Sequence, residues 1–136
     1  MERNQKVEDY MRTIYRLRKN GLVRGAYIAR ELGVSKPTVS VALREMEAAG
    51  YLTVRHDRTI ELTEKGEAIG KSVIERNNVL FGLLTDLGVD KRIADADACN
   101  MEHGISDESL RALIELRHFL RVIRNTYYSE KTKTDE

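Results

Sequence analysis

Three side chains in the second half of the chain have the types and the spacing of a metal site. Cys99, Glu102 and His103 stand at positions i, i+3 and i+4. On a helix, residues with this spacing share one face and have neighbouring Cβ atoms. Thiolate, carboxylate and imidazole are all metal donors, so the pattern indicates a metal-binding segment. The alternative interpretation is structural, with Cys99 as a small buried hydrophobe and His103 as the partner of a neighbouring carboxylate.

One helix face rarely completes a coordination shell, so we expect a fourth ligand from elsewhere in the chain. Glu8 and Asp9 are candidates because both lie off the apolar stripe of the first predicted helix. Asp95, one helical turn before Cys99, is a third candidate. The residues alone do not choose among the three.

The elements that precede this segment have the order of a winged helix-turn-helix, in which two helices joined by a tight turn are followed by a β-hairpin. Gly33 suits the left-handed backbone after a helix end, Ser35 suits an N-cap, and Pro37 suits a first helical turn. Apolar periodicity and alternation predict helices over 4–19, 26–32 and 36–49 and strands over 51–54 and 59–62.

The predicted third helix carries small polar and basic side chains at its N-terminal end, which is the end that enters the DNA major groove. The tip of the predicted hairpin is basic, as expected of a wing that touches phosphate or the minor groove. The expected DNA-binding residues are Ser35, Lys36, Pro37, Thr38, Ser40, Arg44, Arg55 and Arg58. The alternative interpretation is a set of solvated charges on a small helical domain.

The second half of the chain is predicted to be all helical, with helices over 63–87, 91–103 and 107–124. The last of these is apolar around much of its circumference. A small monomer rarely exposes so apolar a helix, so we expect a subunit interface and a homodimer. The fold class is therefore mainly α, with a winged helix-turn-helix DNA-binding domain over 1–62 and a helical metal-binding and dimerisation domain over 63–124. The polar residues 125–136 are expected to form a disordered tail.

Composition and charge fit this interpretation. The 136 residues are 33% charged and 6% aromatic, with one cysteine, which cannot form an internal disulfide and fits a reducing cytoplasm. No apolar run reaches about 18 residues, so we expect no membrane span and no membrane partner. Residues 1–62 hold 12 basic and 8 acidic side chains, whereas residues 63–136 hold 11 and 14. A basic half beside an acidic half fits a DNA-binding part and a cation-binding part.

The chain resembles the diphtheria toxin repressor family of iron- and manganese-dependent transcription regulators. The matching motifs occur in the family's order and extend over roughly residues 7–110. ACNMEH with the following ISDE is the most specific of them, whereas the helix-turn-helix alone would be weak. The motifs are EDYMRTIY at 8–15, IARELGVSKPTVS at 28–40, LTEKG at 62–66, ACNMEH at 98–103 and ISDE at 105–108.

The resemblance implies a homodimeric repressor that binds a double-stranded DNA operator when Fe²⁺ or Mn²⁺ is bound, and that is not an enzyme. By position, the implied metal ligands are Asp9, Cys99, Glu102 and His103, which selects Asp9 as the fourth ligand. The soft thiolate favours Fe²⁺ over Mn²⁺, and Zn²⁺ or Co²⁺ can bind such a site in vitro. The chain is expected to be a short form, without the SH3-like third domain of longer members.

Two positions depart from the family's pattern. Asn77 stands where family members usually have a histidine, and Arg12 stands where manganese sensors have a glutamate. Both departures remove donors from a second metal position, so we expect one ion per subunit. Arg12 is expected to supply a fixed positive charge near that position.

Three other functions remain as alternatives. The first is a winged-helix regulator whose metal response is lost or replaced by another ligand, which metal-dependent DNA binding would distinguish. The second is an enzyme that uses Cys99 with His103, although no Gly-rich or oxyanion element accompanies that pair. The third is a dimeric scaffold without a role at DNA.

Overall fold

The structure, a computed structural model, describes residues 4–134. The chain divides into two compact units, one ending at Glu75 and the other beginning at Arg76. The division falls inside helix α4 (Glu64–Asp86), whereas the sequence predicted a boundary between residues 62 and 63. The difference arises because the first turns of α4 pack closely within the first unit.

Two glycines permit that close packing. A Cβ atom on Gly66 would lie 2.0 Å from the backbone oxygen of Tyr51, and one on Gly70 would lie 2.8 Å from the backbone oxygen of Met11. Contacts at these distances exclude any larger side chain. Helix α4 therefore begins as part of the first unit, where Gly66 lies against Tyr51 and Gly70 lies against Met11.

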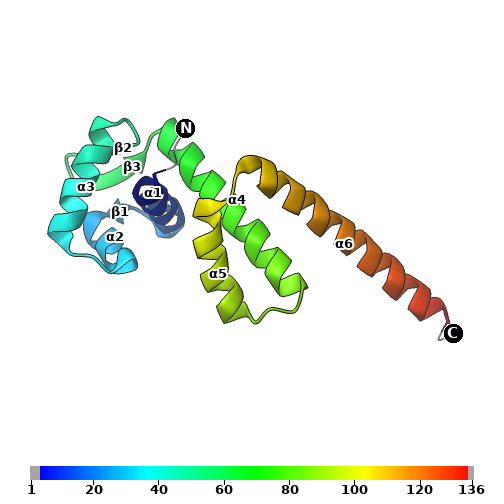
Figure 1. Ribbon diagram of the computed structural model, residues 1–136. Coiled ribbons are helices and arrows are strands. Elements are labelled where there is room, and N and C mark those ends of the chain that lie inside the picture. The colour runs from blue at the N-terminus through cyan, green and yellow to red at the C-terminus, as the bar shows by residue number, and fades with distance from the viewer. Residues whose placement is uncertain (1–3, 135–136) are drawn as a thin grey trace. The chain divides into compact units, whose positions relative to one another are not determined.

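The first unit is a winged helix-turn-helix, as predicted (Figure 1). Its strands β1 (Val23–Arg24), β2 (Leu52–Val54) and β3 (Thr59–Leu62) form one antiparallel sheet in the order β1-β3-β2, with Val23 opposite Ile60 and Leu52 opposite Leu62. The sequence did not reveal β1, because two residues are too few to show alternation. The elements are α1 (Gln5–Leu17), a 3₁₀ turn η1 (Arg18–Asn20), β1 (Val23–Arg24), α2 (Gly25–Leu32), α3 (Lys36–Ala48), β2 (Leu52–Val54) and β3 (Thr59–Leu62).

The turn between α2 and α3 has the predicted chemistry. Gly33 has φ 66°, in the left-handed region that favours glycine at a helix end. The Ser35 hydroxyl accepts a hydrogen bond from the backbone N–H of Thr38 at 3.2 Å, which caps the start of α3. Together these two residues fix how α3 leaves the turn.

One apolar core holds the first unit together. It draws side chains from α1, α2, α3 and the sheet, and its centre is fully buried. Burial of this kind is the main stabilising contribution in a small domain. The core residues are Tyr10, Met11, Ile14, Val23, Ile28, Ala29, Val39, Ala42, Leu43, Met46, Leu52 and Ile60.

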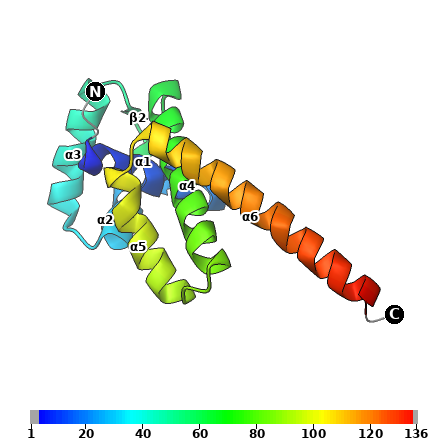
Figure 2. The same ribbon diagram turned by 45° about the vertical axis from the view of Figure 1, so that its right-hand side comes forward.

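The second unit contains the C-terminal part of α4, helix α5 (Lys91–Gly104) and helix α6 (Asp107–Thr134). Helix α5 lies alongside α4 in both views (Figures 1 and 2). Asp90 caps α5 by accepting from Arg92 N–H at 2.9 Å, and Ser106 caps α6 by accepting from Ser109 N–H at 3.1 Å. Both helices begin where the sequence predicted, at residues 91 and 107.

Helix α6 is longer than the sequence predicted. We expected it to end near residue 124 and residues 125–136 to be disordered, but the helix continues to Thr134, so that expectation is corrected for 125–134. Continuing an existing helix costs little, and i, i+4 contacts support the extension. Lys131 lies 5.9 Å from the ring centroid of Tyr127, and Arg124 lies 5.8 Å from that of Tyr128. The end of the predicted tail, 135–136, lies outside the described residues.

Between residues 4 and 134, the helices all lack an apolar stretch long enough to cross a membrane.

Candidate metal centre and nucleic-acid interface

Helix α5 presents the predicted metal donors along the edge of its buried face. Ala94, Ala98 and Glu102 repeat every four residues, and all three are fully buried. Cys99 and His103 each follow one residue later, so they lie beside this stripe and are partly exposed. The sequence prediction that Cys99, Glu102 and His103 share a helix face is therefore confirmed by the backbone.

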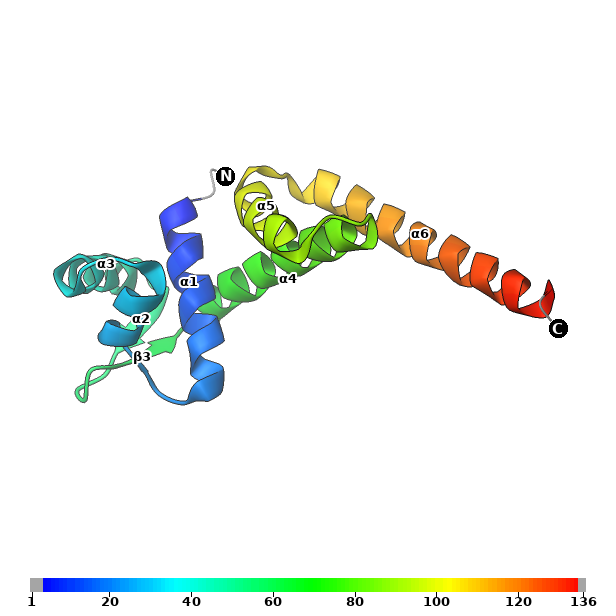
Figure 3. The same ribbon diagram turned by 90° about the horizontal axis from the view of Figure 1, so that it is seen from below.

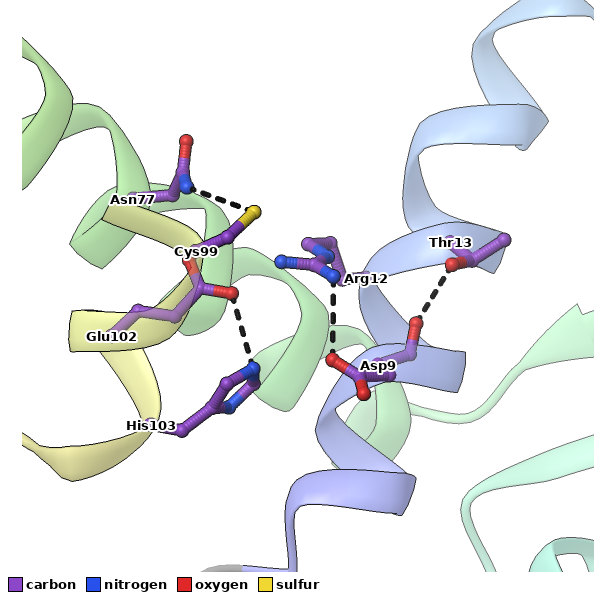
Figure 4. Close-up of polar contacts among 7 residues, drawn as sticks. All are labelled: Asp9, Arg12, Thr13, Asn77, Cys99, Glu102 and His103. Carbon is purple, nitrogen blue, oxygen red and sulfur yellow. Dashed lines mark hydrogen bonds and ion pairs between the residues drawn. The ribbon is translucent and has the colours of Figure 1, made fainter. Parts of the chain in front are cut away.

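Each of the three donors on α5 contacts another side chain of the protein (Figure 4). The Nε2 atom of His103 lies 3.4 Å from Oε1 of Glu102, and the side-chain amide of Asn77 on α4 donates to Sγ of Cys99 at 3.8 Å. Over the described part of the chain, no three His, Cys, Asp or Glu side chains converge in a metal-binding arrangement. The donor chemistry fits a divalent transition metal, and coordination requires these side chains to turn toward a common point.

Asp9 and Arg12 belong to helix α1 of the first unit. The guanidinium of Arg12 lies 3.3 Å from Oδ1 of Asp9, one turn earlier (Figure 4). Thr13 donates its hydroxyl to the backbone oxygen of Asp9 at 2.8 Å. Asp9 is therefore held next to a fixed positive charge, because an arginine stays protonated at any physiological pH.

The two departures from the family's pattern are both buried or partly buried polar side chains. Asn77 is 5% exposed on α4, and Arg12 is partly buried on α1. Arg76, next to Asn77, is 6% exposed and pairs with Asp107 at the start of α6. An amide and a guanidinium thus occupy positions where metal donors were expected from the resemblance.

Every predicted DNA-binding residue is exposed on the first unit, from Ser35 through Arg58. A groove of about 800 Å³ runs between α3 and the strands of the wing. Of the predicted residues, the groove brings together Lys36, Pro37, Ser40, Arg44 and Arg58. Four positive charges line it when Arg24 is included, which suits a polyanion.

The remaining predicted residues lie outside that groove. The hydroxyls of Ser35 and Thr38 are 2.7 Å apart at the N-terminus of α3, where exposed backbone N–H groups also attract phosphate. Arg55 lies on the hairpin and pairs with Glu61 at 3.1 Å. These residues flank the groove on the helix side and on the wing side.

The hairpin loop projects beyond α2 and α3 (Figure 3). Asp57 organises it: the hydroxyl and the backbone N–H of Thr59 donate to Oδ1 of Asp57, at 2.6 and 3.0 Å. These hydrogen bonds, chiefly that of the hydroxyl, lower the pKa of Asp57 below its ordinary value. Arg58 has φ 68°, a conformation that turns the chain sharply between the strands.

Three residues of this surface were missed by the sequence interpretation. Arg24 lines the groove and donates to the backbone oxygen of Asp57 at 3.1 Å. Glu47 on α3 accepts the backbone N–H of Val54 at 2.6 Å, which ties the helix to the wing. Val41 is 50% exposed on α3. The sequence signal for this exposure is that Val41 lies outside the apolar stripe of the helix.

Comparison with known proteins supports the interpretation of both halves of the chain. Residues 4–60 match the family described as iron dependent repressor, N-terminal DNA binding domain. Residues 63–123 match the family described as iron dependent repressor, metal binding and dimerisation domain. The two matched segments together account for most of the chain.

Individual relatives carry related names. The chain is 40% identical over 111 residues to the diphtheria toxin repressor of Corynebacterium efficiens, covering 80% of this chain and 48% of that protein. The iron-dependent repressor IdeR of Mycobacterium tuberculosis is likewise 40% identical over 111 residues, with the same coverage. The transcriptional regulator MntR of Escherichia coli is 36% identical, covering 81% of this chain and 72% of that protein. The chain thus spans about half the length of the first two relatives.

Solved structures share the fold. The metal-dependent transcriptional regulator MtsR superposes with a TM-score of 0.75 at 24% identity, covering 88% of this chain and 55% of that one. IdeR of T. acidophilum superposes with a TM-score of 0.70 at 21% identity, covering 82% of this chain and 53% of that one. With two family domains matched in order and relatives at 40% identity, the chain belongs to the iron dependent repressor family.

Proposed function

We propose that this protein is a cytoplasmic, metal-dependent transcriptional repressor that binds operator DNA as a homodimer, with Fe²⁺ or Mn²⁺ as its corepressor. The single observation that carries the proposal is the placement of Cys99, Glu102 and His103 on one face of α5. In this chain, those donors accompany a winged helix-turn-helix with a basic groove. The names of its relatives, diphtheria toxin repressor and IdeR, support the same function.

The proposed metal ligands are Asp9, Cys99, Glu102 and His103. Cys99 and His103 support this assignment because they are partly exposed and therefore accessible to an ion. Two carboxylates with an imidazole and a thiolate suit Fe²⁺ well and accept Mn²⁺, while Zn²⁺ and Co²⁺ are expected to bind in vitro. If residues of both α1 and α5 bind the ion, the affinity for DNA would depend on the concentration of the metal.

One ion per subunit is proposed, because Arg12 and Asn77 supply no anionic donor. The Arg12 guanidinium beside Asp9 places a permanent positive charge where a second cation would otherwise be needed to balance a carboxylate. Asn77 is already engaged as a donor to Cys99. Neither side chain favours another divalent ion next to it.

The proposed dimer interface lies on helix α6. The helix has large apolar and aromatic side chains that remain exposed in a single chain, and a contiguous exposed apolar surface is typical of an interaction site. A second copy of the chain is the occupant that the family description, a dimerisation domain, supports. The exposed residues are Ile114, Leu116, Phe119, Val122, Ile123, Tyr127 and Tyr128.

The DNA surface is proposed to consist of the residues predicted from the sequence together with Arg24. Helix α3 supplies Lys36, Ser40 and Arg44 to the major groove, while Arg58 and Arg55 on the wing contact phosphate or the minor groove. A dimer presents two copies of this surface, so the operator is expected to contain two related half-sites.

The test is DNA binding to the region upstream of the protein's own gene under anaerobic conditions. Fe²⁺, Mn²⁺ and Zn²⁺ are titrated separately, with a chelator as control. Tight binding that requires Fe²⁺ or Mn²⁺ supports the proposal and ranks the two ions. Binding that is equal with and without chelator would overturn the metal dependence.

That second outcome would instead support a winged-helix regulator without a metal response. The contact between Arg12 and Asp9 is the observation that favours this second candidate, since an arginine can replace a cation beside a carboxylate. Isothermal titration of Mn²⁺, and of Fe²⁺ under anaerobic conditions, in the absence of DNA distinguishes the two candidates directly. One bound ion per subunit supports the metal-dependent repressor, and no binding supports the alternative.

A further inference from the structure

Helix α3 has a buried face and an opposite, solvent-facing side. Val39, Ala42, Leu43 and Met46 form the buried face and belong to the core of the first unit. On a 3.6-residue helix, the centre of the opposite side falls at positions 37, 41, 44 and 48. Val41 therefore stands near the middle of the surface that a major groove would meet.

Val41 is apolar and 50% exposed, while most of its surroundings are polar. Lys36, Ser40 and Arg44 line the groove on one side of it, and Glu45 on the other pairs with Lys6 at 3.4 Å. Pro37 lies one turn before Val41, at i−4, and is also exposed. The two residues make a short apolar strip along a surface that is otherwise mostly polar or charged.

Exposure alone would not single out Val41, because isolated apolar side chains are common on protein surfaces. Its residue type and its place give the stronger argument. A β-branched side chain is a poorer helix former than alanine, and an exposed position supplies no core packing to compensate. A valine in this place gains its packing only when a partner covers it.

The DNA major groove contains one apolar group that can do so. Thymine carries a 5-methyl group there, whereas the other edges of the base pairs present hydrogen-bond donors and acceptors. Val41 has no hydrogen-bonding group in its side chain, so it discriminates bases only by apolar contact and shape. Its neighbour Arg44, at i+3, has the forked donors that suit guanine.

We infer that Val41 is a specificity-determining residue that selects thymine in each operator half-site by packing on the 5-methyl group, with Pro37 extending the same apolar strip. This inference rests on the proposed function, because it requires α3 to enter a major groove. It goes beyond that function by naming the base and the atom that are read.

The experiment is a cycle that combines Val41→Ala with removal of thymine methyl groups. Preferred sequences are first selected from random duplex DNA by the whole chain, in parallel with Fe²⁺ under anaerobic conditions, with Mn²⁺ and with chelator. Each thymine of the selected site is then replaced singly by deoxyuridine, which removes only the 5-methyl group. Dissociation constants are measured for the wild type and for Val41→Ala on every duplex.

For the wild type, at least one deoxyuridine should weaken binding about four-fold, the value expected for one buried methyl group. Val41→Ala should bind the thymine duplex more weakly than the wild type does. Its affinity should not fall further when that same thymine is replaced by deoxyuridine. Val34→Ala removes an exposed valine from the turn before α3 and serves as the matched control. Val34→Ala should lose as much affinity as the wild type does when that thymine is replaced by deoxyuridine.

Two results overturn the inference, and they are distinguishable. If a sequence is selected but each deoxyuridine replacement weakens binding equally in the wild type and in Val41→Ala, only the role of Val41 is refuted. If no sequence is selected with Fe²⁺, with Mn²⁺ or with chelator, the proposed function fails and the inference fails with it. Circular dichroism of Val41→Ala confirms folding, which alanine at an exposed helical site should preserve.

Discussion

The side-chain amide of Asn77 on α4 donates a hydrogen bond to the Sγ atom of Cys99 on α5, over 3.8 Å. This contact orients one of the proposed metal ligands from a neighbouring helix. It lies in the second unit, where Asn77 is 5% exposed, so water competes little for the amide.

Asn77→Ala should therefore weaken Mn²⁺ binding by about 10- to 100-fold, the usual cost of losing a group that orients a ligand. Isothermal titration measures it. The matched control is Asn78→Ala, which removes the adjacent exposed amide and should leave affinity unchanged. An equal loss in both variants would contradict an orienting role for Asn77.

Removing a proposed ligand should have a larger effect. Cys99→Ala and His103→Ala should each lower metal affinity by more than about 100-fold and abolish metal-stimulated DNA binding. Both side chains are partly exposed, so the helices and the dimer should persist. Asp97→Ala, an exposed acidic residue of the same helix, is the control. Normal metal-stimulated binding by either ligand variant would refute the assignment.

Arg44→Ala should weaken DNA binding while leaving metal affinity unchanged. If Arg44 reads guanine, the loss is about 1–3 kcal/mol and is confined to sequences that carry that base. If it contacts only phosphate, binding to all sequences weakens equally. The slope of log affinity against log salt concentration then decreases in magnitude by about one. Fluorescence anisotropy over a salt series separates the two, with Arg16→Ala, an exposed arginine of α1, as control. Altered metal affinity alone would mean that the DNA surface is misplaced.

The wing should loosen in acid because of Asp57. Its pKa lies below the ordinary value of 3.8, since the hydroxyl and N–H of Thr59 stabilise the charged form. A group with a lowered folded pKa contributes stability above its unfolded pKa, and the contribution disappears as pH falls through the folded pKa. The amide resonance of Thr59, followed by NMR from pH 5 downward, should move with a midpoint below 3.8. In Asp57→Ala that titration should vanish, whereas a midpoint above the ordinary value would contradict the hydrogen bonds.

Gly66→Ala should destabilise the first unit. The added Cβ would lie 2.0 Å from the backbone oxygen of Tyr51, so α4 would have to shift. Overpacking of this kind costs about 1–3 kcal/mol in the free energy of unfolding. Gly104→Ala at the end of α5 is the control, because its Cβ would meet no atom within 4 Å. Similar urea midpoints for the two variants would show that α4 can move without cost.

Local sequence signals predicted most of the fold. Ser35 caps α3 as predicted, because a capping side chain depends only on its next few residues. The helices predicted over 63–87, 91–103 and 107–124 likewise begin at local caps, which are Thr63, Asp90 and Ser106. The same signals failed for strand β1, whose two residues are defined by their pairing with β3 rather than by any pattern of their own.

The candidate sites were predicted unevenly for the same physical reason. The donors of α5 share a helical repeat, so their common face follows from spacing alone. Arg24, Glu47 and Val41 became visible only when β1, β2 and α3 were arranged in space. The contact between Asn77 and Cys99 joins two helices and has no signature in either one.

The hydrogen bond from Val54 N–H to Glu47 also bears on how the molecule behaves at high concentration. Strand β2 lies at one edge of the sheet, and an exposed edge can recruit a strand from another chain and begin aggregation. Glu47 occupies a donor on that edge with a charged side chain. The opposite edge is β1, which at two residues is too short to serve as a template. The wing can therefore extend its basic loop into solvent without offering either edge of its sheet to a neighbouring molecule.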